Sequence, residues 1–360
     1  MHDYLTQRGG AERVVLAMTR AFPEAVVHTS LYDPDGTYPE FRDVDVRVSG
    51  LNRVPLLRSK HQIALPVLPW AMRRVEVGDV DVVLVSSSGW AHGVHSEVPV
   101  VVYCHNTPRW LYQVEDYELG LGWLKRLGLR LLDHRLRRWD GWAAQRAHRY
   151  LANSRSVQAR ISDIYGREAE LLPPPLCLDP NGPQSHIPGI EPGYLLTVSR
   201  VRGYKATQLI ADAAGLLPHE RLVIVGGTPP GFRDHPNVTV VEDITDEELR
   251  WLYANAEALV AMSREDFGLT PPEANSHGVP SLVLRAGGYL ETTVEGVSGL
   301  FIDESDARSL ADGIERLRDT FFDPEQIRRH AAQFDEETFA ARLRDVLHDA
   351  AATKAVAAQA

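Results

Sequence analysis

The stretch Ser263–Pro280, SREDFGLTPPEANSHGVP, predicts how the second half of this chain folds. It follows a short apolar run, Glu257–Met262, of the kind that forms a buried strand. It then contains Gly268 and a pair of prolines, which suit the first turn of a helix. The pattern is therefore strand, glycine-containing turn and helix. Such a turn directs the backbone N–H groups of residues about 268–271 at a ligand above the strand ends, and these groups suit an anion.

Two carboxylates belong to this stretch, Glu265 in the turn and Glu273 in the first turn of the helix. We expect both to reach the same ligand, each at a different part of it. These residues alone leave a second interpretation open, in which Glu273 only complements the helix dipole and Glu265 is a solvated loop residue.

The composition is typical of a soluble globular protein. Its 360 residues are 44% hydrophobic and 24% charged, and that length favours two domains. No apolar run is long enough to span a membrane, and we expect no signal peptide. The two cysteines, Cys104 and Cys177, form neither a disulfide framework nor a metal cluster. We therefore expect a protein of the reducing cytoplasm.

The net charge of −11 is unevenly distributed. Residues 1–180 are nearly neutral, and residues 181–360 carry almost all of the negative charge. This asymmetry suggests two domains with different partners. Because neither domain is strongly basic, nucleic acid is not an expected partner.

The N-terminal region contains a glycine pair, Gly9 and Gly10, that opens an apolar-periodic helix. Such a pair lets the backbone approach a phosphate or sugar closely, although a simple turn is the alternative. Only eight residues precede Gly9, and none of them belongs to a four-residue apolar run. We infer that a first strand is missing and that the natural protein extends upstream of Met1, which puts the folding and activity of the 360-residue form in doubt.

The rest of the chain alternates strands and helices, as doubly wound α/β domains do. The strands expected in the first domain are Ala25–Thr29, Val44–Val48, Val80–Ser86, Val98–Cys104 and Arg149–Ala152. Those expected in the second are Tyr194–Ser199, Arg221–Val225, Val238–Val241, Ala258–Met262, Ser281–Leu284 and Leu300–Ile302.

Polar residues follow several of these strands, at the edge where open parallel sheets bind ligands. His105 follows an all-apolar strand, and the serines at 86–88 follow its neighbour. We expect His105 in the site, with a structural histidine as the alternative. In the second domain Gly226 follows one strand, and Thr245 with Glu248 forms a predicted capping box after another.

Three Asp-x-Asp pairs could in principle hold a divalent cation. Two of them lie at strand starts, the wrong end of the sheet, and the third lies in a turn: Asp79/Asp81, Asp43/Asp45 and Asp33/Asp35. We expect no metal.

Residues 123–149 are basic and amphipathic. A packed helix with a solvated basic side explains this pattern, and so does an interfacial helix that docks on anionic lipid or on a lipid-phosphate acceptor. Residues 173–193 are proline-rich and predict a stiff linker.

The predicted domains are 1–172, the linker 173–193, and a second α/β domain 194–335. A C-terminal helix over 336–350 is expected to pack back towards the first domain, followed by a disordered tail over 351–360. Arg200 and Lys205 follow the first strand of the second domain, where two cations suit a diphosphate.

These residues resemble the retaining GT-B glycosyltransferases of glycosyltransferase family 4, and the match runs nearly end to end. It rests on the Glu-x7-Glu block with Phe267-Gly268-Leu269 inside it, the Arg200/Lys205 pair, His105 and the N-terminal glycines. The loop from His105 to Trp110 is similar to that of mannosyltransferases that build bacterial surface polysaccharide.

The resemblance implies two Rossmann-like domains that face each other across a cleft, and a site built from both. It also implies that the second domain, 194–335, binds the nucleotide-sugar donor. Arg200, Lys205 and the N–H groups of Leu269 and Thr270 would neutralise the donor's diphosphate, so that no metal or other cofactor is required. Glu273 would hold the ribose and the loop at Ile244 the base. Phe267, Gly268, Gly226, Gly9 and Gly10 would line the donor site. Glu265 and His105 would contact the donor sugar.

The resemblance thus implies a metal-independent, retaining hexosyltransferase at the inner face of a membrane. The donor would be a nucleoside-diphosphate sugar, with GDP-mannose favoured over UDP-sugars, and the acceptor a glycan or polyprenyl-linked lipid. Retention would proceed by front-side attack. A catalytically impaired sugar-nucleotide-binding or glycan-binding homologue is the alternative. A GT-B epimerase or phosphorylase is a third reading, and the sequence shows no pyridoxal-binding lysine motif for a phosphorylase.

Overall fold

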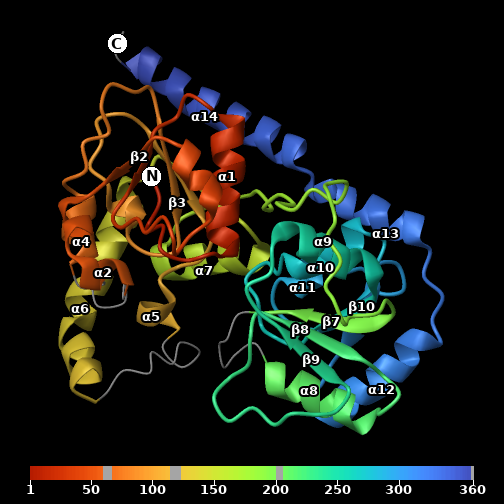
Figure 1. The fold of residues 1–360 in the computed structure, drawn as a ribbon. Helices are drawn as coiled ribbons and strands as arrows, with labels where there is room; N and C mark the ends of the chain where they lie inside the picture. The colour runs from red at the N-terminus through yellow and green to blue at the C-terminus, as the bar shows by residue number, and fades with distance from the viewer. Residues whose placement is uncertain (60–66, 114–122, 200–205, 358–360) are drawn as a thin grey trace. The chain divides into compact units, whose positions relative to one another are not determined.

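The structure is a computed structural model that describes residues 1–59, 67–113, 123–199 and 206–357. The chain divides into two units (Figure 1). Unit 1 comprises Met1–Cys177 and Glu336–Ala360, and unit 2 comprises Leu178–Asp335. Each unit is described by itself.

Unit 2 is built on a six-stranded parallel sheet in the order β12-β11-β10-β7-β8-β9. The strand order reverses between β7 and β10, which makes this pair the switch point of a doubly wound sheet. The strands are β7 (Tyr194–Val198), β8 (Leu222–Val225), β9 (Val238–Val241), β10 (Ala256–Ala261), β11 (Ser281–Leu284) and β12 (Gly299–Ile302).

Helices cover both faces of this sheet (Figure 1). One core packs α8 and α12 on the strands, and the other packs α9 and α10 on the opposite face. The predicted capping box is confirmed, because Thr245 and Glu248 exchange both hydrogen bonds at the start of α9. The helices are α8 (Thr207–Leu216), α9 (Asp246–Asn255), α10 (Thr270–Ser276), α11 (Tyr289–Thr292), α12 (Ala307–Arg318), α13 (Pro324–Ala331) and the short η5 (Ala332–Phe334).

Unit 1 has a parallel sheet of the same kind. β3, β4, β5 and β6 pair in that order, and β1 pairs with β2. The strands are β1 (Val27–Thr29), β2 (Val46–Val48), β3 (Val83–Ser87), β4 (Val100–Cys104), β5 (Arg149–Ala152) and β6 (Glu170–Leu171). All five expected strands of this half are present within three residues of their expected ends, and β6 was not expected.

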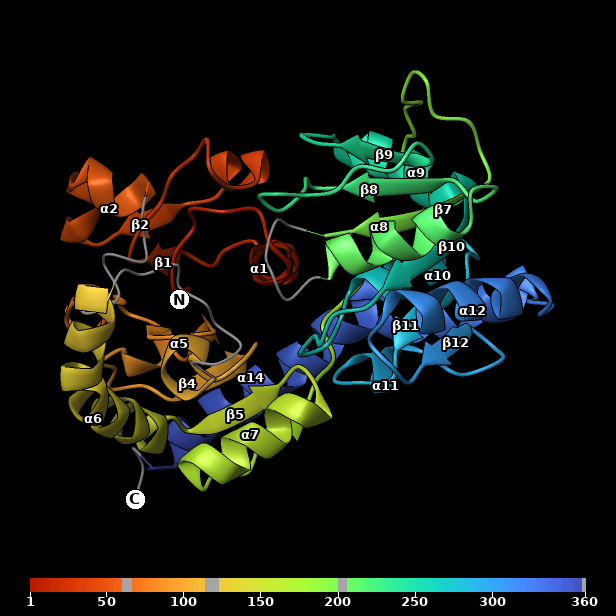
Figure 2. The ribbon, with the colours of Figure 1, turned by 90° about the horizontal axis from the view of Figure 1, so that it is seen from below.

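Two groups of helices cover the two faces of the unit 1 sheet. α6 and α7 pack on one face, and α7 lies along β5 in Figure 2. The other face carries α1 and α14. The helices are α1 (Gly10–Ala21), η1 (Pro39–Asp43), η2 (Gly50–Arg53), α2 (Pro55–Ser59), α4 (Leu68–Met72), η3 (Ala91–Gly93), α5 (Arg109–Tyr112), α6 (Trp123–Arg146), α7 (Arg155–Tyr165) and α14 (Glu336–Ala357).

The first residues of the chain take the central position of this sheet. No strand precedes α1 among residues 1–59, as the sequence predicted, but His2 forms parallel bridges to both Thr29 and Ser86. The Ser86 N–H donates to the Met1 carbonyl, and the Leu5 N–H donates to the Leu31 carbonyl. The position is therefore not empty. The sequence pattern does not predict this position because His2 and Asp3 are polar, although both are buried.

The C-terminal helix belongs to unit 1. Phe339, Leu343 and Leu347 of α14 share a core with Val14 and Met18 of α1. The helix continues through Ala357, so the expected disordered tail from residue 351 is wrong over 351–357. Alanine has the highest helix propensity, and an alanine-rich end therefore extends a packed helix.

The proline-rich segment is not a free linker along its whole length. The boundary between the units lies between Cys177 and Leu178. Leu178 and Ile190 are 1% and 5% exposed and join the core of unit 2, and the Ser185 N–H donates to the Glu247 carbonyl. The apolar residues between the prolines anchor residues 178–193 to unit 2.

Candidate active site

The SREDFG loop begins directly after β10, one of the two strands at the switch point of unit 2. Ligands of open α/β sheets bind in the crevice at this point, outside the carboxyl ends of the strands. The loop is bound to the one that follows β11, since the Gly288 N–H donates to the Glu265 carbonyl at 2.9 Å.

Glycines allow these two loops to interlock. A Cβ on Gly288 would lie 2.2 Å from the Phe267 carbonyl oxygen, and one on Gly287 would lie 2.4 Å from the Glu265 carbonyl oxygen. Gly268 has φ +81° and lies against the Tyr289 ring, where a Cβ would be 2.5 Å from a ring carbon. Only glycine satisfies both the backbone conformation and the close approach.

Side chains from both loops orient Glu265. The Ser263 hydroxyl donates to Glu265 Oε1 at 2.8 Å, and the same hydroxyl lies 2.9 Å from the Tyr289 hydroxyl. Ser263 and Tyr289 are buried, whereas Glu265 is partly exposed. Ser263 thus holds one carboxylate oxygen of Glu265, and the partly exposed side chain can still reach a ligand.

Glu273 lies in the first turn of α10, which begins with Thr270 and carries prolines at its first positions. The side chain is 7% exposed, and Oε2 accepts a 2.8 Å hydrogen bond from the Tyr253 hydroxyl. Leu269 occupies the N-cap, and no described side chain caps this end. Its backbone can therefore meet an anionic ligand from outside the chain.

Gly226 and Ile244, also predicted for the site, lie at the same edge of the sheet. Gly226 follows β8 with φ +100°, and Ile244 is partly buried just before α9. Arg200 and Lys205 lie outside the described residues, and their roles stay predictions.

In unit 1, His105 follows β4 and is 8% exposed. Its Nε2 lies 2.8 Å from the Ser86 hydroxyl at the end of β3. Burial, together with the nearby His2, lowers the pKa of His105 to about 3. The ring is therefore neutral near pH 7 and suits hydrogen bonding to a neutral ligand group. Gly10 begins α1, and Gly9 is its N-cap.

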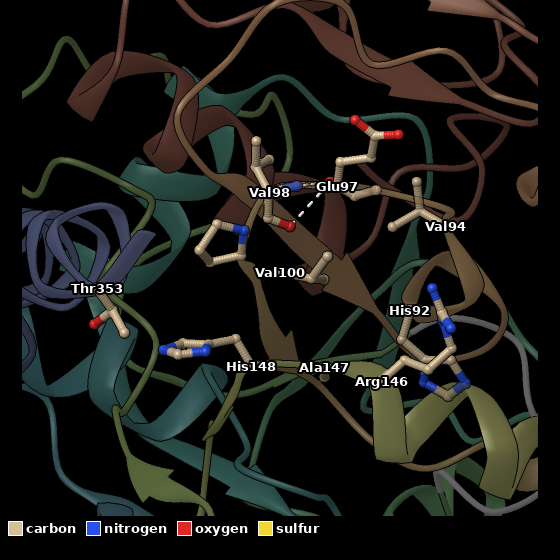
Figure 3. Close-up of a pocket in the computed structure, with 11 residues that line it drawn as sticks. His92, Val94, Glu97, Val98, Val100, Arg146, Ala147, His148 and Thr353 are labelled. Carbon is tan, nitrogen blue, oxygen red and sulfur yellow. Dashed lines mark hydrogen bonds between the residues drawn. The ribbon is translucent and has the colours of Figure 1, made fainter. Parts of the chain in front are cut away.

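Unit 1 also has a pocket of about 540 Å³, which lies away from His105 (Figure 3). It is lined by His92, Val98 and Pro99 ahead of β4, by His148 ahead of β5, and by Thr353 of α14. These positions are at the amino ends of the strands, opposite His105. None of the predicted site residues that the structure describes lines it.

Sequence reasoning missed the side chains that orient the predicted ones. Tyr253 and Tyr289 belong to helices and carry no motif that links them to Glu273 and Glu265. Asp140, counted as part of the basic stretch, is fully buried and accepts hydrogen bonds from Tyr112 and Tyr165. Two partners of His105, Ser86 and Asn153, had a signal in the sequence, because each is a polar residue at the end of an apolar strand.

Two family models match the chain. One, described as Glycosyltransferase Family 4, matches residues 8–179, and the other, Glycosyl transferases group 1, matches residues 192–320. The chain belongs to glycosyltransferase family 4. It is therefore a glycosyltransferase, an enzyme that takes a sugar from a sugar-nucleotide donor. No described helix is both long and apolar enough to cross a membrane.

Curated relatives of this family 4 chain include the alpha-1,3/1,6-mannosyltransferase alg-2 of Neurospora crassa. It is 25% identical over 94% of this chain and 88% of that protein. The chain is also similar to D-inositol 3-phosphate glycosyltransferases. That of Pseudarthrobacter chlorophenolicus is 29% identical over 48% of each protein, and that of Mycolicibacterium smegmatis is 30% identical over 38% of this chain and 36% of that protein. The chain thus spans less than half of these two relatives.

Solved structures share the fold of this family 4 chain. HepE of Anabaena, in complex with UDP-glucose, has a TM-score of 0.69 at 19% identity and covers 97% of this chain and 98% of its own. Sucrose-phosphate synthase of Thermosynechococcus elongatus has a TM-score of 0.69 at 20% identity, with 97% and 96% covered. The likeness and the two doubly wound units identify the GT-B fold.

Proposed function

We propose that this glycosyltransferase moves mannose from GDP-mannose, with retention at the anomeric carbon, to a glycan or lipid-linked acceptor. The product would serve cell-surface polysaccharide or glycolipid synthesis. The observation that carries the proposal is the interlocked Glu265 loop at the switch point of unit 2, because it presents a carboxylate and a helix start at one ligand position. The similarity to a mannosyltransferase supports mannose as the sugar.

The diphosphate of the donor is negatively charged, so we expect cationic side chains next to it. Arg200 and Lys205 would neutralise the diphosphate as it leaves with the nucleotide, so the reaction would proceed without a metal ion. The N–H groups of Leu269 and Thr270 would add to this stabilisation. Glu273 would accept hydrogen bonds from the ribose hydroxyls, and the backbone near Ile244 would meet the base.

The bond from the sugar's anomeric carbon to the phosphate oxygen breaks, and a bond to the acceptor oxygen forms on the same face. The acceptor's proton passes to the leaving phosphate. Glu265 would hold the sugar hydroxyls during this step. His105 would contact the sugar as a neutral hydrogen-bonding group.

We also propose that unit 1 contacts an anionic membrane surface, and an exposed aromatic and basic patch supports this. Trp70 is 55% exposed with the Arg74 guanidinium 3.8 Å from its ring, and Trp142 is 42% exposed between Arg73 and Arg146. Tryptophan suits the level of the lipid headgroups, and arginine suits anionic lipid. The patch joins α4 to the basic helix α6.

The test of the reaction is release of nucleoside diphosphate from a panel of GDP- and UDP-sugars, with polyprenyl-linked acceptors present. Release from GDP-mannose alone is the expected result. Release from a UDP-sugar alone would overturn the donor assignment and leave the transferase. Nucleotide binding without release from any donor would favour a sugar-nucleotide-binding homologue.

Lys205→Ala tests the diphosphate role. Transfer should fall by at least about a hundredfold, because one preorganised charge contact to the leaving group is lost. Lys354→Ala, in α14 of unit 1, is the matched control and should leave transfer unchanged. Unchanged transfer by Lys205→Ala would refute the assignment.

A further inference from the structure

A buried chain of polar side chains leads to His105 in unit 1. His2 and Ser86 are 3% and 1% exposed, and Glu12 of α1 is 1% exposed. These residues come from the N-terminal segment, from β3 and from α1, and they meet at the carboxyl edge of the sheet. Water has little access to them, so their hydrogen bonds decide where the protons lie.

The distances connect the chain. His2 Nδ1 lies 3.1 Å from the Ser86 carbonyl oxygen and 3.0 Å from the Ser86 hydroxyl oxygen. The same hydroxyl oxygen lies 2.8 Å from His105 Nε2. On the other side, His2 Nε2 faces Glu12 Oε1 at 3.9 Å, and Gln7 Nε2 donates to that carboxylate oxygen at 2.9 Å. The His2 ring is therefore fixed with Nδ1 towards Ser86.

The carbonyl oxygen settles the direction of the hydrogen bonds. A carbonyl oxygen only accepts, so we assign a proton to His2 Nδ1, which then donates to it. A protonated Nδ1 cannot accept from the Ser86 hydroxyl. Within the part of the chain that the structure describes, the remaining partner of this hydroxyl is His105 Nε2. The Ser86 O–H therefore donates to Nε2, and the proton of a neutral His105 ring lies on Nδ1.

We propose that His2 and Ser86 are positioning residues that hold His105 in the tautomer protonated on Nδ1. With Nε2 occupied by Ser86, the nitrogen left for a ligand is a hydrogen-bond donor. A sugar oxygen is the group it would recognise. The contact with the donor sugar rests on the proposed function, whereas the tautomer does not.

The neutral state of His105 agrees with this arrangement. Burial lowers its pKa to about 3, so the ring is neutral near neutral pH. A ring that only donates a hydrogen bond fits that state.

The direct test is nuclear magnetic resonance on the full chain labelled with ¹⁵N in its histidine rings. Shifts of the ring nitrogens distinguish a protonated from an unprotonated nitrogen, and His105→Gln assigns the signals by their loss. We expect a protonated Nδ1 and an unprotonated Nε2 near neutral pH. A protonated Nε2 would overturn the inference, and no variant other than the assignment control is needed for this reading.

Variants at Ser86 test the positioning. Ser86→Ala should give a mixture of tautomers and lower kcat about tenfold, the effect of one hydrogen bond. Ser86→Thr keeps the hydroxyl and should restore both. Ser162→Ala, an exposed serine of α7, is the control. A single unchanged tautomer in Ser86→Ala would overturn the inference. A shifted tautomer with unchanged kcat would support it and remove His105 from the proposed reaction.

Discussion

The Tyr253 hydroxyl of α9 donates a 2.8 Å hydrogen bond to Glu273 Oε2 at the start of α10. Two helices that follow different strands of unit 2 thus share one carboxylate. The Tyr253 ring also stacks on His277 at the end of α10, with centroids 5.6 Å apart. The position of Glu273 therefore depends on how α9 and α10 pack together.

Tyr253→Phe should weaken nucleotide binding. The variant keeps the ring and removes the donor to Glu273, and a hydrogen bond to a charged group contributes about 1.5–3 kcal/mol. The dissociation constant for the nucleoside diphosphate should rise about tenfold or more, as measured by calorimetry. Tyr194→Phe is the control, since Tyr194 loses a similar bond to the Leu252 carbonyl at the amino end of β7. Equal affinities of the two variants would contradict the role of Glu273.

Gly288→Ala should disrupt the interlocked loops. The added methyl would lie 2.2 Å from the Phe267 carbonyl oxygen, so backbone must shift. We expect a loss of about 1–3 kcal/mol of stability and a severe loss of transfer. Gly141→Ala in α6 is the matched control, because its Cβ would meet nothing within 4 Å and alanine favours a helix. Wild-type transfer by Gly288→Ala would show that the loops do not shape the site.

His105 should make unit 1 less stable in acid. Its pKa is about 3 in the folded chain, against the ordinary histidine value of 6.5, so below about pH 6.5 the unfolded chain binds a proton that the folded chain does not. Stability is therefore fully present above about pH 6.5 and falls with pH below it, by at most about 1.4 kcal/mol per pH unit. His105→Gln should flatten this slope.

Urea unfolding between about pH 7.5 and about pH 4.5, followed by tryptophan fluorescence, measures the slope. All but Trp251 of the seven tryptophans belong to unit 1, so the signal reports mainly on that unit. His148→Gln, an exposed histidine, should leave the slope as it is. A slope that is equally steep without His105 would assign the acid sensitivity to other groups.

The aromatic and basic patch should carry membrane binding. The pair Trp70→Ser and Trp142→Ser removes both exposed rings, and binding to vesicles with anionic lipid should fall about tenfold in a sedimentation assay. Phe321→Ser on unit 2 removes a ring that is 87% exposed outside the patch and should have no effect. Equal binding to neutral and anionic vesicles would contradict the role of the arginines.

The sequence predicted the strands well because buried parallel strands are continuous apolar runs. It placed Glu265, Glu273 and His105 at strand ends or helix starts for the same reason. It missed the bond between Tyr253 and Glu273, because no periodic pattern links residues on two helices. The central position of His2 was missed as well, since its burial depends on hydrogen bonds to Ser86 rather than on apolarity.

The close packing around the glycines of the two loops could be predicted only in part from the sequence. Gly268 stood out as a turn residue, whereas the contact between Gly288 and Phe267 joins loops after two different strands. Such a contact follows from the order of β10 and β11 in the sheet, which a local pattern does not contain. The roles of Arg200 and Lys205 stay predictions, and transfer by Lys205→Ala tests the second of them.

Because α14 closes unit 1, the polypeptide leaves that unit at Cys177 and returns to it at Glu336. Unit 2 is one continuous stretch and can fold on the ribosome as soon as it has emerged. Unit 1 must wait with one face of its sheet uncovered, since Val14, Met18 and Tyr103 can pack on Phe339 and Leu343 only after unit 2 has been synthesised. A chaperone that shields apolar surface would act on this face until α14 has been synthesised.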